Sequence, residues 1–103
     1  MPSQDFKRSD RIADLIKVEI SKVLSTEVKD PRIQGITVLG VKLTPDMKKA
    51  DISISQSNSF NSLNPSEVKK GLENAKGFIR KKLSQNLNLR RTPEIFFKIE
   101  DLI

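Results

Sequence analysis

The spacing of apolar residues changes along this chain from helical to strand-like and back, and this order limits the folds available to it. Before residue 28, apolar residues recur every three or four positions, as in Ile12, Ile16 and Ile20, which is the spacing of one face of an amphipathic helix. Residues 36–44 are rich in β-branched side chains, and residues 50–55 alternate between apolar and polar. Such segments predict strands. The chain therefore combines helices and strands.

The pattern predicts five elements in one domain, which is the default for a chain of 103 residues. In chain order they are a helix at 9–28, strands at 36–44 and 50–55, an interrupted helix at 65–87 and a strand at 94–100. Two amphipathic helical segments and a three-stranded sheet with one apolar face indicate an α+β two-layer sandwich, with the helices on one face of the sheet. The alternation in the second strand favours antiparallel pairing.

Capping residues and a proline set the expected helix boundaries. The first helix starts at an N-cap formed by Ser9 or Asp10, after a flexible segment 1–8. It ends before Pro31, because a proline disfavours helical geometry in the residue that precedes it. The second helix follows a polar loop and starts at Asn64, a good capping residue with a proline directly after it.

The charge of the chain points to a polyanionic partner. Nineteen Lys and Arg residues against thirteen Asp and Glu give a net charge of +6, which favours nucleic acid first and an anionic membrane surface second. A basic protein without any such partner remains an alternative. No apolar run approaches the about 20 residues of a membrane span, and the N-terminus lacks the core of a signal peptide. We therefore expect a cytoplasmic protein without a membrane partner.

The absence of two residue types narrows the possible chemistry. The chain contains neither cysteine nor histidine, which excludes disulfides and Cys-based zinc sites and removes the usual general base. The carboxylates, serines and lysines that remain form no recognisable catalytic constellation. We expect a binding protein with no enzymatic activity, no metal, no cofactor and no small-molecule substrate.

Positive charge is concentrated between residues 69 and 91. The cations of this segment are Lys69, Lys70, Lys76, Arg80, Lys81, Lys82, Arg90 and Arg91. A solvated helix face is the ordinary explanation of such a run, and a basic amphipathic helix can also lie on a membrane. The concentration of charge in one element favours nucleic acid over both.

Gly77 interrupts the helical pattern where this charge is densest. A glycine inside a helix costs about 1 kcal/mol relative to alanine. One explanation is close packing against a neighbouring element. The other is a break between two helices, which lets the backbone and a helix N-terminus approach phosphates, as KH domains do.

Three separated segments of the chain read KDPRI at 29–33, AKGFIRKKL at 75–83 and LRRTPEIFF at 89–97. Together they resemble the ribosome-binding factor A family of bacterial small-subunit maturation factors. The resemblance implies a type II KH-like fold of order α-β-β-α-kink-α-β, with the interhelical kink at Ala75, Lys76 and Gly77. Many members continue past the last strand into a charged tail, whereas this chain stops at Ile103, so we expect one KH-like domain over 1–103 without an extended tail.

The resemblance also implies a function. Members of the family bind the free small (30S) ribosomal subunit and assist late maturation of 16S rRNA, including processing of its 5′ end. They matter most in the cold, leave before translation begins and are not enzymes. We expect a monomer with these properties. A general KH-like binder of single-stranded nucleic acid and a protein-interaction adaptor remain as alternatives.

The expected RNA-binding residues surround the interrupted helix. They are Lys69, Lys70, Lys76, Gly77, Arg80, Lys81 and Lys82, extended by Arg90 and Arg91 and, depending on the first loop, by Lys29 and Arg32. Asp30 and Pro31 are expected to shape that loop rather than to contact RNA. Recognition through phosphates and shape suits a chain with no Trp or Tyr.

Overall fold

The order of helices and strands follows the order predicted from the sequence, with one short helix added. The computed structural model describes residues 4–55 and 65–100. In chain order its elements are α1 (Gln4–Thr26), the 3₁₀ helix η1 (Pro31–Ile33), β1 (Thr37–Leu43), β2 (Lys49–Ser55), α2 (Pro65–Asn86) and β3 (Glu94–Ile99). The predicted polar loop and the predicted cap Asn64 lie outside the described residues.

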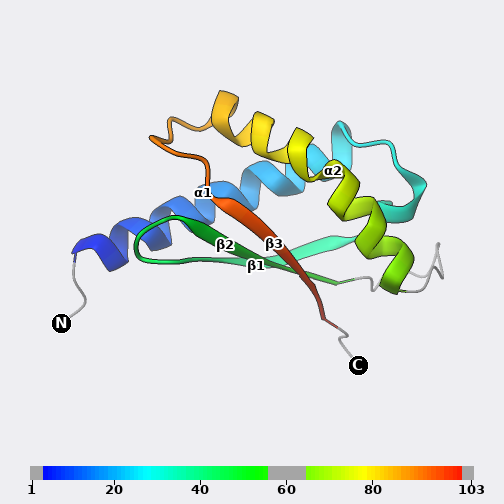
Figure 1. The fold of residues 1–103 in the computed structure, drawn as a ribbon, viewed down its shortest axis with the longest axis horizontal. Coiled ribbons are helices and arrows are strands. Elements are labelled where there is room, and N and C mark those ends of the chain that lie inside the picture. Colours follow the sequence, from blue (N-terminus) through cyan, green and yellow to red (C-terminus); the bar gives the residue numbers. More distant parts are fainter. Residues whose placement is uncertain (1–3, 56–64, 101–103) are drawn as a thin grey trace.

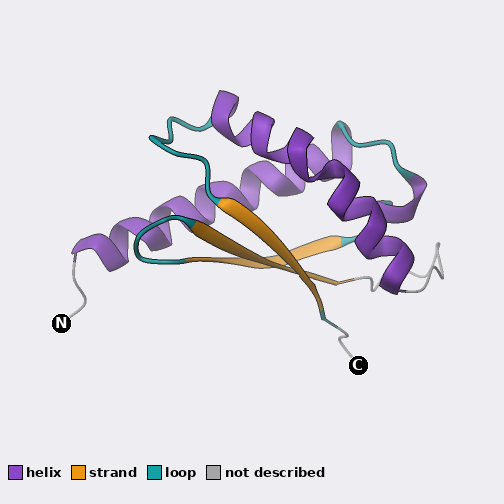
Figure 2. Cartoon of the chain, in the orientation of Figure 1, coloured by secondary structure: helices purple, strands orange, loops and turns teal. Residues whose placement is uncertain are grey.

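Both long helices lie on the same face of a three-stranded sheet (Figures 1 and 2). The residues of the apolar stripes identified in the sequence pack against one another between these two layers. The fully buried side chains include Ile16, Ile20, Ile52, Ile54, Leu72, Ile79, Leu83 and Ile95. Burial of a large aliphatic side chain contributes about 1.5–3 kcal/mol, so this shared core fixes the helices on the sheet. The α+β two-layer fold is confirmed, and it agrees with a KH-like arrangement.

The sheet is mixed rather than antiparallel throughout. Its strand order is β1-β2-β3. β1 and β2 form an antiparallel pair, whereas β2 and β3 run parallel, with Ala50 opposite Ile95 and Ile52 opposite Phe97. The antiparallel expectation is therefore right for β1 and wrong for β3. The reason is the connection, because a crossover through a helix as long as α2 returns the chain to the end of the sheet where β2 began.

α1 begins five residues earlier than the sequence indicated. Its first residue is Gln4, so residues 4–8 are helical and neither Ser9 nor Asp10 is an N-cap. Ser9 is buried, with 2% of its surface exposed, and is followed at helical spacing by the buried Ala13 and Ile16. The buried face of α1 thus extends toward the N-terminus through a small polar residue. Apolar spacing alone does not reveal a buried serine, so this part of the helix was not predicted.

α2 is one continuous helix through Gly77, so the predicted break between two helices is wrong. Within the described residues, positive φ occurs at Gly35 and Met47 but not at Gly77. Val68, Leu72, Ala75, Ile79 and Leu83 place buried side chains on both sides of Gly77. Their combined burial outweighs the cost of about 1 kcal/mol that one glycine imposes.

Candidate nucleic-acid interface

The outward face of α2 carries Gly77 between two exposed lysines. Lys70, Gly77 and Lys81 recur at intervals of seven and four residues, so they lie in one row along the helix. All three are exposed. A Cβ atom added to Gly77 would have no neighbour within 4 Å. Close packing within the protein therefore does not explain this glycine, and an approaching partner can reach the helix backbone here.

The cations of α2 divide into an exposed group and a group held by other side chains. Lys69, Lys70, Arg80 and Lys81 are exposed; together with Gly77 we call them the α2 basic face. Among the described residues Lys69 and Lys81 form no ion pair, and Lys70 has only a loose one, 3.6 Å from Glu67. Their charge is available to an anionic partner.

Lys76 and Lys82 are held along the flanks of α2. The Lys76 ammonium lies 2.9 Å from Glu73 and 5.8 Å from the centre of the Phe96 ring. The Lys82 ammonium lies 3.1 Å from Glu27 and 5.5 Å from the centre of the Phe78 ring. Both lysine side chains are about one-quarter exposed (26%). Each cation is thus matched by a carboxylate and an aromatic face, and the two contribute less to the open positive surface than the sequence suggested.

Arg32 joins the α2 basic face through a local fold in the α1–β1 connection. The Asp30 carboxylate accepts hydrogen bonds from the Arg32 backbone N–H at 2.9 Å and from its guanidinium at 2.7 Å, and so caps η1. These bonds lower the pKa of Asp30 and raise that of Arg32. Arg32 lines a surface cavity with Lys69 and Lys70. Asp30 shapes the loop, as expected, while Lys29 is exposed and does not line this cavity.

Gly71 lets η1 pack closely against α2. It was not among the residues predicted from the sequence. Gly71 is buried. A Cβ atom added there would lie 2.9 Å from Cγ2 of Ile33, closer than real Cβ contacts come. Of the two glycines in α2, the one that serves close packing is therefore Gly71 rather than Gly77.

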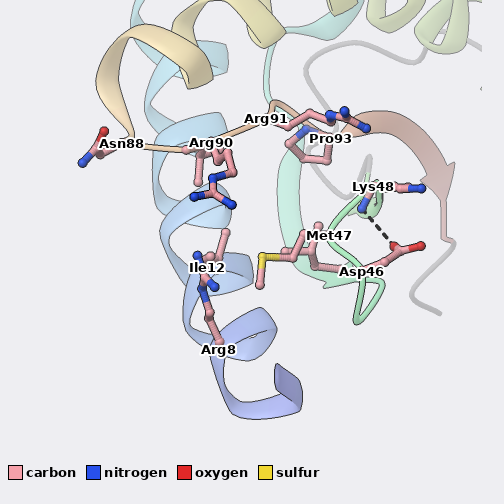
Figure 3. A pocket seen from close by; sticks show the side chains of 11 residues that line it. Arg8, Ile12, Asp46, Met47, Lys48, Asn88, Arg90, Arg91 and Pro93 are labelled. Atoms are coloured by element: carbon pink, nitrogen blue, oxygen red, sulfur yellow. Dashed lines mark hydrogen bonds between the residues drawn. The ribbon is translucent and has the colours of Figure 1, made fainter. Parts of the chain in front are cut away.

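Arg90 and Arg91 follow the C-terminal end of α2 at Asn86, which lies about 24 Å from Lys70 by the rise of the helix. They line a second cavity together with Arg8 and Lys48 (Figure 3). Neither Arg8 nor Lys48 was among the predicted site residues, because one precedes the predicted first helix and the other lies in a turn. Only the fold brings them to Arg90 and Arg91. Arg80 contacts the same α2–β3 connection, since its guanidinium donates to the Thr92 carbonyl at 3.4 Å.

Within residues 4–55 and 65–100, no group of three or more Asp and Glu side chains is placed to hold a metal ion. No helix in the described ranges is long and apolar enough to cross a membrane.

The sequence profile of ribosome-binding factor A matches residues 8–103. The chain belongs to the ribosome-binding factor A family. It is 44% identical over 93 residues to the ribosome-binding factor A of Syntrophus aciditrophicus, covering 90% of this chain and 74% of that protein. It is 41% identical over 100 residues to the same factor from Caldicellulosiruptor saccharolyticus, covering 95% and 73%.

Solved structures of ribosome-binding factor A share the fold. The crystal structure of the factor from Thermus thermophilus superimposes with a TM-score of 0.77 at 18% identity, covering 88% of this chain and 93% of the other. A homology model of the T. thermophilus factor, fitted into a cryo-EM map of a complex with the 30S subunit, gives a TM-score of 0.58 at 21% identity, covering 82% and 90%. At these identities the likeness concerns the fold.

Proposed function

We propose that this protein binds the free small ribosomal subunit and assists late maturation of 16S rRNA, including processing of its 5′ end, with its greatest importance at low temperature. It acts as a monomeric cytoplasmic binding factor rather than as an enzyme. Membership of the ribosome-binding factor A family supports this function, as does the T. thermophilus relative that was fitted into a map of a 30S complex.

The α2 basic face is the observation that carries the proposal for this chain. Lys69, Lys70, Arg80 and Lys81 contact RNA phosphates on either side of Gly77, where the missing side chain lets the RNA backbone come close to the helix. Backbone contacts of this kind recognise the shape of folded RNA rather than its sequence.

The remaining predicted residues have graded roles in this proposal. Arg32 and Lys29 extend the basic face at the N-terminal end of α2, and Arg90 and Arg91 extend it at the other end. Lys76 and Lys82 are held by Glu73 and Glu27, so they stiffen the surface and take a smaller share of the phosphate contacts.

The experiment is co-sedimentation with separated small subunits, large subunits and whole ribosomes. The double variant Arg80→Glu, Lys81→Glu should lose binding to small subunits. The matched control is Lys42→Glu, Lys98→Glu, which changes the net charge equally at exposed positions of β1 and β3. We expect this control to bind like the wild type, with both variants checked for folding by circular dichroism.

Normal sedimentation of the Arg80→Glu, Lys81→Glu protein would refute the role of the α2 basic face. Equal loss in both double variants would mean that net charge, not this surface, determines binding. Wild-type protein that binds short oligonucleotides without preference for small subunits would instead support a general single-stranded nucleic-acid binder. Binding to a protein partner with little salt dependence would support an adaptor.

A further inference from the structure

The cavity beside Arg90 and Arg91 lies past the C-terminal end of α2, where the α2 basic face is joined by residues of other segments. It has a volume of about 370 Å³ and lies where the first turns of α1, the β1–β2 turn and the α2–β3 connection meet (Figure 3). Pockets that hold small organic molecules start at about 300 Å³. The space therefore suits a group of the size of one nucleotide.

The rim of this cavity carries a net positive charge, because four cations and one carboxylate, that of Asp46, line it. Arg8, Lys48, Arg90 and Arg91 are all exposed and form no ion pair within the described residues. The acidic residue of the lining, Asp46, is already engaged, because it accepts hydrogen bonds from the Thr44 hydroxyl at 2.6 Å and from the Lys48 backbone N–H at 3.0 Å. The four cations come from three segments, so they surround the opening rather than follow one helix.

The floor of the cavity is apolar. Its side chains include Ile12, Met47, Leu89 and Pro93. A bare inorganic anion would leave this floor unused, and a purely apolar ligand would leave the cations unpaired. The ligand class that uses both is a flat organic group that carries phosphate, and a nucleobase with its flanking phosphates has this chemistry.

The backbone at Met47 is held in a conformation that its residue type rarely adopts. Met47 has φ of 61°, in the left-handed region. The turn is fixed by the bond from the Met47 N–H to the Thr44 carbonyl at 2.7 Å and by the Thr44–Asp46 contact. In Figure 3 the Met47 thioether extends toward Ile12 across the cavity. Backbone outliers of this kind cluster at ligand sites.

The α2–β3 connection is anchored to the same turn. The Glu94 backbone N–H donates to the Lys48 carbonyl at 2.8 Å, which fixes Pro93 and the two arginines before it beside Met47. The backbone that carries the floor and two sides of the rim is therefore positioned before any ligand arrives, and binding has to order only the exposed cationic side chains.

We propose that this cavity takes one unstacked nucleotide of a single-stranded RNA segment. Its base lies on Met47, Ile12 and Leu89, and its neighbouring phosphates meet Arg8, Lys48, Arg90 and Arg91. The proposal rests on the proposed function in taking RNA as the partner. It adds a second kind of contact, because the α2 basic face meets phosphates alone. The cations lie around the opening, where they can contact the phosphates of a strand that continues past the bound nucleotide. A free nucleotide would use fewer of them.

The direct test uses the Met47 methyl group as a probe. The chain contains only two methionines, Met1 and Met47, so ¹³C-methyl labelling gives an NMR spectrum that is simple to assign. We expect a non-self-complementary RNA decamer to shift the Met47 methyl signal, because the ring of a base would lie against it. The same decamer made fully abasic, and a duplex of equal length, should leave this signal in place.

Two variants test the two halves of the site by decamer affinity. Met47→Gly keeps the left-handed backbone and removes the Met47 side chain from the floor; it should weaken binding about tenfold, as for the loss of one base contact. Arg90→Gln with Arg91→Gln should reduce the slope of log affinity against log salt by about 1.4, the value for two lost phosphate contacts on a single strand. Lys42→Gln with Lys98→Gln removes equal charge from the sheet and should leave the Met47 shift unchanged.

The outcomes separate this proposal from the proposed function. A Met47 signal unmoved by saturating decamer, in protein that co-sediments with small subunits, overturns the nucleotide site alone. A shift produced by AMP and not by the decamer would assign the cavity to a free nucleotide and overturn the strand proposal. A Met47 response in protein that ignores small subunits supports the site and overturns the proposed function.

Discussion

A methyl group placed on Gly71 would lie 2.9 Å from Cγ2 of Ile33, and 3.1 Å from Cβ of Arg32. Ile33 is itself buried, with 1% of its surface exposed, so its side chain has little room to move aside. The contact joins α2 to η1 and thereby sets the position of Arg32 beside Lys69 and Lys70. One missing methyl group thus fixes part of the candidate RNA-binding surface.

Gly71→Ala should therefore destabilise the protein. Overpacking a buried site typically costs about 1–3 kcal/mol, which exceeds the gain of about 1 kcal/mol in helix propensity. The measurement is urea unfolding followed by circular dichroism. An alanine variant as stable as the wild type would show that η1 moves away at little cost.

Gly77→Ala should stabilise the protein, whereas Gly71→Ala destabilises it, and it serves as the matched comparison in the same helix. The position is exposed and helical, and an added Cβ meets nothing within 4 Å. Better helix propensity should raise the free energy of unfolding by up to about 1 kcal/mol. If the RNA backbone approaches closely here, the more stable variant should nevertheless bind small subunits more weakly. Unchanged binding would show that Gly77 takes no part in the contact.

These two glycines illustrate what the sequence could and could not predict. The apolar stripes of α1 and α2 and the alternation Ala50, Ile52, Ile54 predicted the elements and the core, because burial imposes its period on the sequence. The break at Gly77 was wrong, since a local propensity of about 1 kcal/mol is smaller than the burial of the neighbouring stripe. The packing role of Gly71 depends on η1, whose position no local pattern reveals.

Asn86→Ala should loosen the packing of α2 on α1. The Asn86 side-chain amide donates to the Glu19 carboxylate at 2.7 Å, and Glu19 is buried, with 9% of its surface exposed. Removal of the donor leaves a poorly solvated carboxylate and should cost about 1–3 kcal/mol. Thermal unfolding measures the change. Gln85→Ala, at the exposed neighbouring position, is the control and should stay close to the wild type.

Asp30→Asn should lower stability at neutral pH and lose its effect in acid. The Arg32 side chain and backbone N–H hold the pKa of Asp30 below its ordinary value of 3.8. A lowered pKa stabilises the folded state above pH 3.8, and this contribution disappears as the pH falls through the lower folded value. Unfolding of both proteins between pH 7 and pH 2 should show curves that converge below pH 3.8. A constant difference across this range would contradict the charge contact.

The salt dependence of subunit binding should distinguish the exposed cations of α2 from the lysines that are paired with carboxylates. Four phosphate contacts by the α2 basic face contribute about −3 to the log–log slope of small-subunit affinity against salt concentration. Lys69→Gln with Lys81→Gln should reduce the magnitude of this slope by about 1.4 to 1.8. Lys76→Gln with Lys82→Gln removes the same charge and should change it less, because Glu73 and Glu27 already pair with these lysines. Equal changes in both variants would show that the pairs open on binding.

The second cavity shows the limit of sequence reading for the candidate site. Arg90 and Arg91 stood out because they adjoin other cations, whereas Arg8 and Lys48 look like ordinary surface residues. The four converge because β3 runs parallel to β2, which brings the α2–β3 connection next to the β1–β2 turn. Such convergence depends on topology, and alternation within a strand does not specify the direction of its neighbour.

The parallel pairing of β2 with β3 has a consequence for how the chain acquires its structure. β2 meets β1 through a local hairpin, but Lys49 meets Glu94 across nearly half of the sequence. Closing that long loop costs conformational entropy before the contacts between β2 and β3 can stabilise the structure. During synthesis, α1 and the β1–β2 hairpin can therefore assemble while one side of β2 still has unpaired backbone groups, a state that invites pairing with other chains. Only when α2 and then β3 have left the exit tunnel does the middle strand gain its second neighbour.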